Sequence, residues 1–250
     1  MDWTLQAWLL TIVAVTIVGI SKGGFGGGFG MLAVPIMALV MPPMLAAAIL
    51  LPVLCAMDLM AMRAYWRKWS LQHIKITVPA ALIGTIAGAF TFQYLNADHI
   101  RFVIGLISTG FALNNWFKPA QRWIKNKPGP NAGRFWGFTS GFTSFVSHTG
   151  GPPLSVYLLP QKLDKTTLQA TTVLFFTIVN YFKLIPYAML GQLNFANIKI
   201  SLLLLPVAAL AIGIGVYLHK RVSDKLFYQI TYIVLFVTGL KLMYDGLQGF

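Results

Sequence analysis

The sequence has no glutamate and few charged residues of any kind, which sets it apart from ordinary soluble proteins. Charged residues make up 10% of its 250 residues, whereas a soluble domain carries about 25%. The hydrophobic share is 57%, and the mean hydropathy is +0.70. Six aspartates are its only acids, against 19 lysines and arginines. This composition predicts an integral membrane protein.

The cysteine and histidine content excludes several kinds of site. The one cysteine, Cys55, rules out an internal disulfide and a multi-cysteine metal site, so we expect a small buried hydrophobic side chain. The histidines are too scattered in sequence to indicate a metal: His73, His99, His148 and His219. A Gly28-x-Gly30-x-x-Ala33 pattern resembles a dinucleotide-binding loop, but no strand precedes it, so no cofactor is expected. A membrane-embedded enzyme would need a nucleophile–base pair or a metal cluster, and the sequence shows little of either.

The net charge of +13 requires an explanation other than nucleic-acid binding. A nucleic-acid-binding protein gathers its basic residues on a solvated surface. Here they punctuate apolar segments, so we interpret them as topology signals and as contacts to anionic lipids at the cytoplasmic loops. We expect no nucleic-acid partner.

The apolar segments predict an all-α polytopic bundle. A spanning helix needs about 20 apolar residues. Segments of that length are 3–22, 44–63, 73–95, 99–117, 166–189, 197–218 and 224–244. Shorter apolar segments are 29–41, 135–148 and 152–161, the last of them about 15 Å long as a helix. We therefore predict about seven to eight full spans together with short discontinuous helices.

The two halves of the chain resemble each other in sequence. Ile74-Lys75-Ile76 recurs as Ile198-Lys199-Ile200, and Ala97-Asp98 resembles Ser223-Asp224. Such matches keep their order, at offsets between 123 and 127 residues. The pattern predicts a duplication.

The charged loops indicate that the second copy is inverted. The basic loop at 63–68 corresponds to the neutral loop 191–197, whereas the neutral turn 96–97 corresponds to the basic loop 219–221. The charge asymmetry has swapped sides, which predicts an inverted-topology repeat with both termini periplasmic. The predicted divisions are a first membrane repeat at 1–117, a basic cytoplasmic linker at 118–134 and a second membrane repeat at 135–250.

Two glycine-rich breaks interrupt the apolar segments. Ser21–Gly30 contains six glycines in ten residues, and a second break runs from Ser147 to Pro153. Glycine in a helix costs about 1 kcal/mol relative to alanine. A broken backbone in lipid survives only where protein or a polar cavity satisfies its freed groups. We interpret the two breaks as facing walls of one binding site.

The groups at these breaks favour an anion as the ligand. Each break opens a short helix whose first N–H groups carry a partial positive charge, and nearby hydroxyl and basic side chains are further donors. The alternative is close helix packing through small residues, as expected for Gly19-x-x-x-Gly23, Gly84-x-x-x-Gly88 and Gly137-x-x-x-Gly141. The predicted substrate-binding residues are Ser21, Lys22, Gly23, Gly24, Gly26, Gly27, Gly28, Ser147, His148, Thr149, Gly150, Gly151 and Pro152.

Two ionisable residues leave alternatives open. Lys22 lies about 29 Å along a straight helix, so it either binds the ligand or reaches the far interface as an anchor. Asp58 lies within an apolar run and is a candidate for proton coupling, together with His148. Its alternative is a structural ion pair with Arg63 or Lys68. A further group is expected at the interface: Asn114, Asn115, Lys183 and Lys199.

The paired breaks resemble the signatures of a known family. Gly19–Gly30, followed by Pro35, resembles the first signature of the sulfite exporter TauE/SafE family, and Gly141–Pro153 resembles the second. The likeness covers nearly the whole chain. It implies a bacterial inner-membrane permease for sulfite, sulfonates or related organosulfur anions. The site that it implies is Ser21–Gly28 together with Ser147–Pro152.

The sequence therefore predicts a secondary transporter for a small sulfur-containing anion, bound at paired helix N-termini near the bilayer midplane. The alternative is a passive anion channel that uses the same glycine-rich segments as its filter. The sequence leaves open whether a second copy of the chain is a partner in a homo-oligomer.

Overall fold

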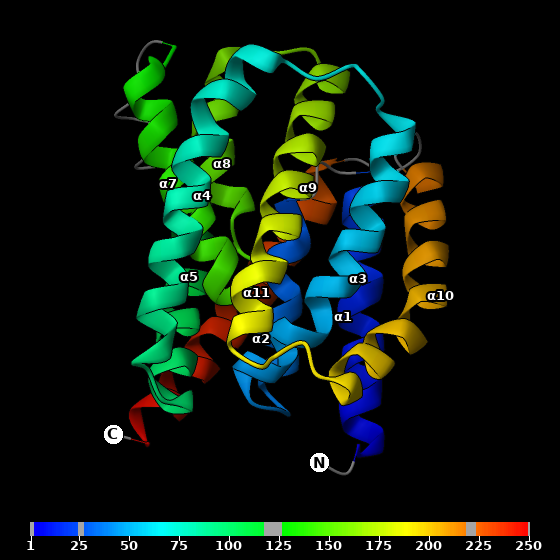
Figure 1. Cartoon of the computed structure of the whole chain (residues 1–250), viewed down its shortest axis with the longest axis vertical. Helices are drawn as coiled ribbons and strands as arrows, with labels where there is room; N and C mark the ends of the chain where they lie inside the picture. The colour runs from blue at the N-terminus through cyan, green and yellow to red at the C-terminus, as the bar shows by residue number, and fades with distance from the viewer. Residues whose placement is uncertain (1–2, 25–27, 118–126, 219–223, 250) are drawn as a thin grey trace.

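The computed structural model describes residues 3–24, 28–117, 127–218 and 224–249 (Figure 1). In these residues the chain forms ten α-helices and two 3₁₀ turns, with no strand. The elements are α1 (Leu5–Gly24), η1 (Gly28–Leu32), α2 (Ala33–Ala38), α3 (Pro43–Ala64), α4 (Leu71–Gln93), α5 (Ala97–Phe117), α7 (Pro130–Ser147), α8 (Gly151–Leu158), η2 (Leu159–Gln161), α9 (Lys165–Met189), α10 (Phe195–Leu218) and α11 (Asp224–Leu247). The predicted all-helical fold class is confirmed.

Long helices occupy all seven positions predicted for full spans. Within the described residues, five helices are long and apolar enough to cross a membrane: α1, α3, α4, α9 and α10. The predicted number of seven to eight spans is therefore not confirmed. Helix α5 carries Asp98, His99 and Arg101 near its start, and α11 carries Lys241 and Asp245 near its end, which dilutes their apolar character.

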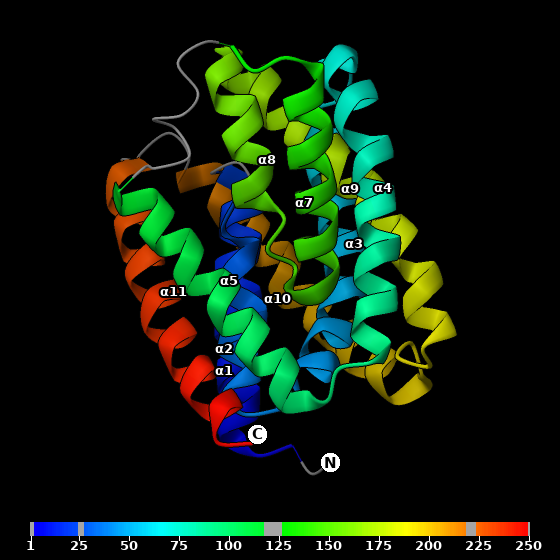
Figure 2. The same ribbon diagram turned by 90° about the vertical axis from the view of Figure 1, so that its left-hand side faces the viewer.

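Helices that the predicted repeat would make equivalent run in opposite directions. In Figure 1, α3 runs upward and α9 downward, α4 downward and α10 upward, and α5 upward and α11 downward. Both chain termini lie at the same end of the bundle. The packing follows the same pairing, in which α1 would match α7, α4 would match α10 and α5 would match α11. Helix α4 packs against α7, and the matching pair, α10 and α1, also pack together. Helix α5 packs against α11 (Figure 2).

Small residues allow the α1–α10 and α4–α7 pairs to approach closely. A Cβ atom at Gly19 would lie 2.5 Å from the Cβ of Ala211 in α10. A Cβ at Gly84 would meet the carbonyl oxygen of Phe138, and one at Gly137 would lie 2.5 Å from that of Thr77. The packing role predicted for the three small-x-x-x-small pairs is confirmed.

The two short-helix predictions have different outcomes. The segment predicted at 152–161 forms α8, with prolines in its first turn, followed directly by η2. Proline suits the first turn of a helix because no amide hydrogen is needed there. The segment predicted at 29–41 instead begins with the 3₁₀ turn η1 and continues as the six-residue α2.

Candidate functional site

The two glycine breaks come together inside the bundle. Helix α7 ends at Ser147 because His148 adopts a left-handed conformation, with φ at 55°, and the chain then turns into α8. Gly30 of η1 faces this turn, and a Cβ atom added to it would lie 3.9 Å from the carbonyl oxygen of His148. The structure thus confirms that the breaks adjoin one another.

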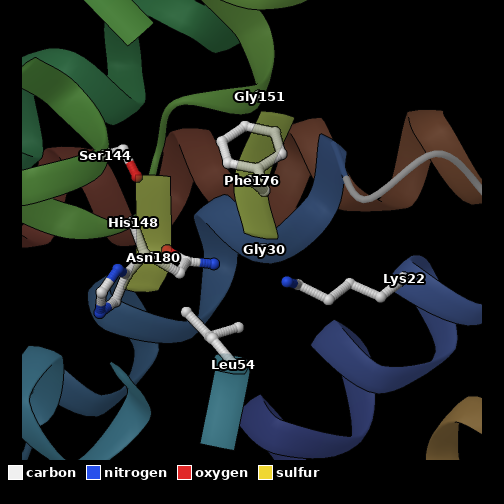
Figure 3. A pocket seen from close by; sticks show the side chains of 8 residues that line it. All are labelled: Lys22, Gly30, Leu54, Ser144, His148, Gly151, Phe176 and Asn180. Atoms are coloured by element: carbon white, nitrogen blue, oxygen red, sulfur yellow. The ribbon is translucent and has the colours of Figure 1, made fainter. Parts of the chain in front are cut away.

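A small cavity opens between the breaks (Figure 3). Its walls come from both halves of the chain: α1, η1 and α3 on one side, and α7, α8 and α9 on the other. In this conformation it has room for about one water molecule. The lining residues are Lys22, Gly30, Leu54, Ser144, His148, Gly151, Phe176 and Asn180.

The hydroxyl groups of the second break bond to the turn itself. The Ser147 and Thr149 oxygens lie 2.7 Å apart, and both lie within 3.4 Å of the Thr143 carbonyl oxygen. Ser140 donates a 2.6 Å hydrogen bond to the carbonyl oxygen of Gly150. These bonds add to the backbone hydrogen bonds that the same two carbonyl oxygens accept from Thr149 and Leu154, so the hydroxyls stabilise the turn.

The start of α8 offers fewer donors than the sequence predicts. Gly150 is the N-cap, and the first turn contains Pro152 and Pro153, which have no amide hydrogen. The amide groups that this end can present are those of Gly150 and Gly151. Because Gly151 lines the cavity and has no side chain, a ligand can approach the backbone closely there.

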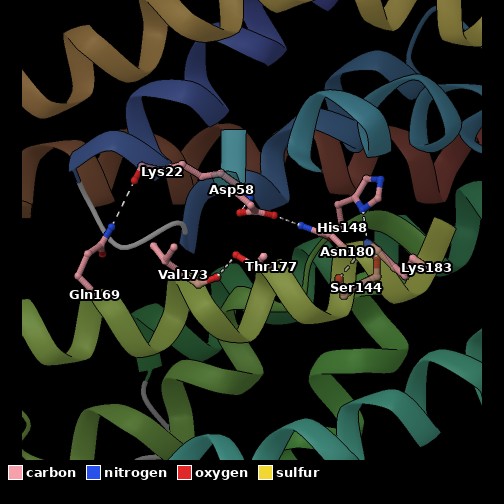
Figure 4. A network of polar contacts seen from close by, with 9 residues as sticks. All are labelled: Lys22, Asp58, Ser144, His148, Gln169, Val173, Thr177, Asn180 and Lys183. Carbon is pink, nitrogen blue, oxygen red and sulfur yellow. Dashed lines mark hydrogen bonds and ion pairs between the residues drawn. The ribbon is translucent and has the colours of Figure 1, made fainter. Parts of the chain in front are cut away.

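Lys22 and Asp58 form a buried ion pair beside the cavity (Figure 4). Lys22 is 6% exposed and Asp58 is 1% exposed, and the second carboxylate oxygen of Asp58 accepts a 2.7 Å hydrogen bond from Asn180. The alternative of Lys22 as an interfacial anchor is therefore wrong. The suggested partners of Asp58, Arg63 and Lys68, are exposed, so the structural pair predicted with them is wrong as well.

The contact between Asp58 and Asn180 joins the two halves. Asp58 lies on α3, and Asn180 lies at the comparable place on α9. The aspartate accepts hydrogen bonds from Lys22 and Asn180 at different carboxylate oxygens, which matches an ionised carboxylate. An ion pair out of water needs such extra hydrogen bonds, because desolvation opposes its Coulomb attraction.

A second buried cation, Lys183, lies on the other side of the cavity. Its Nζ atom lies 2.8 Å from the carbonyl oxygen and 3.1 Å from the Oγ of Ser144, and 2.6 Å from Nδ1 of His148. The prediction that Lys183 lies at the interface is wrong, because its side chain is fully buried. Position along α9 indicates its depth, but the inward direction of its face depends on the packing of α9 against α3 and α4.

The sequence does contain a signal for Lys183. Asn180 and Lys183 are three residues apart, which places both on one face of a helix. Two strongly polar residues on one face of an apolar helix are more typical of a polar interior than of an interface. Lys183 lies behind the cavity wall; the lining residues that were not predicted are Gly30, Leu54, Ser144, Phe176 and Asn180.

The predicted site residues separate into three groups. Lys22, His148 and Gly151 line the cavity. Gly23 instead packs against the Ile212 carbonyl oxygen of α10. The remainder lie near the breaks without lining the cavity or lie outside the described residues: Ser21 and Gly24 end α1, Gly28 begins η1, Ser147, Thr149, Gly150 and Pro152 form the α7–α8 turn, and Gly26 and Gly27 are not described.

The chemistry of the lining favours negative charge. An ammonium group, an amide side chain, a hydroxyl and a glycine backbone converge on it from Lys22, Asn180, Ser144 and Gly151. These groups can donate hydrogen bonds to an oxyanion. Within the described residues, no three histidine, cysteine or acidic side chains come together as a metal ion would require.

Comparison with known proteins agrees with this description. The sequence profile of one family, Sulfite exporter TauE/SafE, matches residues 11–242. Searches of curated proteins and of solved structures found no match. Because the profile covers nearly the whole chain and its apolar helices are those of a multi-pass membrane protein, the chain belongs to the sulfite exporter TauE/SafE family.

Proposed function

We propose that the protein is a secondary transporter that moves a small sulfur-containing anion, such as sulfite or an organosulfonate, across the bacterial inner membrane. The observation that carries this proposal is the cavity, because glycine breaks from both halves border it and hydrogen-bond donors line it. The family is one of exporters, which supports transport rather than catalysis.

In the proposed complex, the anion rests between the α8 start and the side chains of Lys22 and Asn180. Gly30 and Gly151 keep the walls free of side chains, so backbone groups can approach the oxyanion. The partial positive charge at the α8 N-terminus adds to the attraction. Leu54 and Phe176 supply apolar walls, which suit the alkyl part of an organosulfonate.

Alternating access is the proposed mechanism, with the halves rocking around the cavity. The opposite directions of equivalent helices support the inverted repeat that such motion requires. The small room in the cavity favours an occluded transporter state over an open channel. Asp58 and His148 are the proposed proton-coupling groups, since a proton on Asp58 would remove its attraction for Lys22.

The proposed orientation places the chain termini in the periplasm. The connection between α3 and α4 lies at the opposite end of the bundle and carries Arg67 and Lys68, and Arg63 lies in the last turn of α3 beside it. Lysine and arginine near span ends are retained on the cytoplasmic side. The same basic loops would contact anionic lipid headgroups there.

A graded change at Gly30 tests the proposed site. A Cβ at Gly30 has ordinary contacts, the nearest at 3.9 Å, so Gly30→Ala should fold, and Gly30→Leu should reach into the cavity. We expect uptake of sulfite or methanesulfonate into proteoliposomes to fall by at least about tenfold in Gly30→Leu, and less in Gly30→Ala. Gly110→Leu is the matched control, because a Cβ there has nothing within 4 Å. Full uptake by Gly30→Leu, or indifference of the wild type to sulfite, sulfonates, thiosulfate and carboxylates alike, would exclude this function at this cavity.

A further inference from the structure

The buried charges around the cavity do not balance. In the described part of the chain, the buried lysine and acidic side chains are Lys22, Asp58 and Lys183. Lys22 and Asp58 neutralise each other as an ion pair. The sum of the buried charges therefore depends on the charge of Lys183 and on that of His148 beside it.

The hydrogen bonds of His148 define a neutral imidazole. Its Nε2 atom lies 3.0 Å from the carbonyl oxygen of Ala47, which can only accept, so Nε2 carries a proton. Its Nδ1 atom lies 2.6 Å from the Nζ of Lys183, so one proton lies between these two nitrogens; with an ammonium at Lys183, Nδ1 is the acceptor. One proton on the ring leaves His148 without charge.

The surroundings of Lys183 suit an ammonium group. Its Nζ atom has three neighbours that can accept: the carbonyl oxygen of Ser144, the hydroxyl of Ser144 and Nδ1 of His148. An ammonium supplies one proton to each of them. All three neighbours are neutral, so with Lys183 as an ammonium its positive charge is held by dipoles alone, and the sum of the buried charges is +1. Burying a charge with dipoles alone leaves it strongly attractive to an anion.

Ser144 connects this charge to the cavity. Its oxygen accepts a hydrogen bond from Lys183, which leaves its own hydroxyl hydrogen to be donated elsewhere, and Ser144 is a lining residue. The charge of Lys183 polarises this hydroxyl toward a guest in the cavity. Lys22, in contrast, lines the cavity with its charge already engaged by Asp58.

We infer that Lys183, acting through Ser144, supplies the charge that balances the transported anion, and that the site therefore selects singly charged oxyanions over doubly charged ones. A hydrogensulfite or alkylsulfonate ion would neutralise the buried sum, whereas sulfate would leave an uncompensated negative charge. This inference rests on the proposed function, and it adds the valence of the substrate to it.

Methanesulfonate and sulfate are the probes for the test, because both are tetrahedral and they carry one and two charges at neutral pH. Binding of each to the purified full-length protein is measured by calorimetry. We expect the wild type to bind methanesulfonate at least about tenfold more tightly than sulfate. Lys183→Gln, with a buried sum of zero, should lose on the order of 10- to 100-fold in methanesulfonate affinity. Asp58→Asn, with a sum of +2, should shift the preference toward sulfate.

Two control variants distinguish an effect of the buried charge on anion preference from a general loss of folding. The double variant Lys22→Met with Asp58→Leu removes the ion pair but keeps the sum of the buried charges at +1. Affinity for both anions should fall, because Lys22 lines the cavity, while the ratio of the two affinities should still favour methanesulfonate. Lys241→Gln removes an exposed charge and should change neither affinity. Uptake of the two probes into proteoliposomes by the wild type should follow the same order.

The outcomes distinguish the two proposals. If the wild type binds the two anions equally or prefers sulfate, or if Lys183→Gln keeps the wild-type preference and affinity, the valence inference is overturned while the transport function stands. If the folded wild type binds and transports none of the sulfur anions, the proposed function is overturned and this inference with it.

Discussion

Replacing one member of the buried Lys22–Asp58 pair removes the counter-charge of the other without altering the surrounding helices. The two side chains are only 8% and 2% exposed, so water cannot solvate the charge that remains. Breaking a buried pair in this way costs about 3–5 kcal/mol. Coulomb attraction of about 4 kcal/mol, for charges about 4 Å apart at an effective dielectric constant of about 20, is of the same size.

The double-mutant cycle makes this prediction quantitative. Lys22→Met and Asp58→Leu should each lower the free energy of unfolding by about 3–5 kcal/mol. The double variant should lose less than either single variant, because no unpaired charge is left and the replacements are apolar. The hydrogen bond from Asn180 to Asp58 is also lost, so some deficit should remain.

Thermal unfolding of the purified protein in detergent is the assay. For a chain of this size about 1 kcal/mol corresponds to a Tm change of about 2–4 °C, so each single variant should unfold about 6–20 °C below the wild type. The matched control is Lys241→Met, which breaks the exposed pair with Asp245, whose side chains are 57% and 29% exposed. Such a surface pair contributes about 0.3–0.5 kcal/mol. The reasoning would be refuted if each single variant lowered the Tm no more than this control does. It would also be refuted if the double variant lowered the Tm by the sum of the two single-variant changes.

Two further predictions follow from the packing and from the surface. Gly141→Ala should destabilise the protein by about 1–3 kcal/mol, because its Cβ would collide with the Ala81 carbonyl oxygen, whereas Gly110→Ala has open space; equal Tm values for the two would contradict the close α4–α7 contact. Hydrogen bonds from the side chain and backbone of Thr167 lower the pKa of Asp164, the N-cap of α9. Its stabilising effect should therefore be complete above the ordinary aspartate pKa of about 3.9 and fade as the pH falls through the lower folded value. The Tm difference between wild type and Asp164→Ala measures this, and a difference that grows on acidification would be the wrong sign.

The positions of the long helices could be predicted closely from the sequence. The expected segment 166–189 corresponds to α9 at Lys165–Met189, and 197–218 corresponds to α10 at Phe195–Leu218. Helix ends follow local chemistry: Asp164 caps α9, and prolines occupy the first turn of α8. Such signals act within a few residues, so they are visible without knowledge of the fold.

The partners of the buried charges could not be predicted in the same way. Asp58 was expected either to couple protons or to pair with a nearby basic residue, but it pairs with Lys22, 36 residues away, and bonds to Asn180, 122 residues away. Lys183, expected at the interface, is buried against Ser144 and His148. The position of a residue along a helix indicates its depth in the membrane. Which other helix the residue contacts is decided by how the helices pack.

The sequence by itself determined that this is a helical membrane protein with two glycine breaks and a shortage of acids, because backbone propensity, apolar length and composition are local properties. Only the tertiary structure decided that the breaks share one cavity, that Lys22 is neutralised by Asp58, and that Lys183 lies buried among neutral partners. The physical reason is that electrostatic balance inside the bundle is a sum over side chains from α1, α3, α7 and α9. That sum has a value only once those helices pack together.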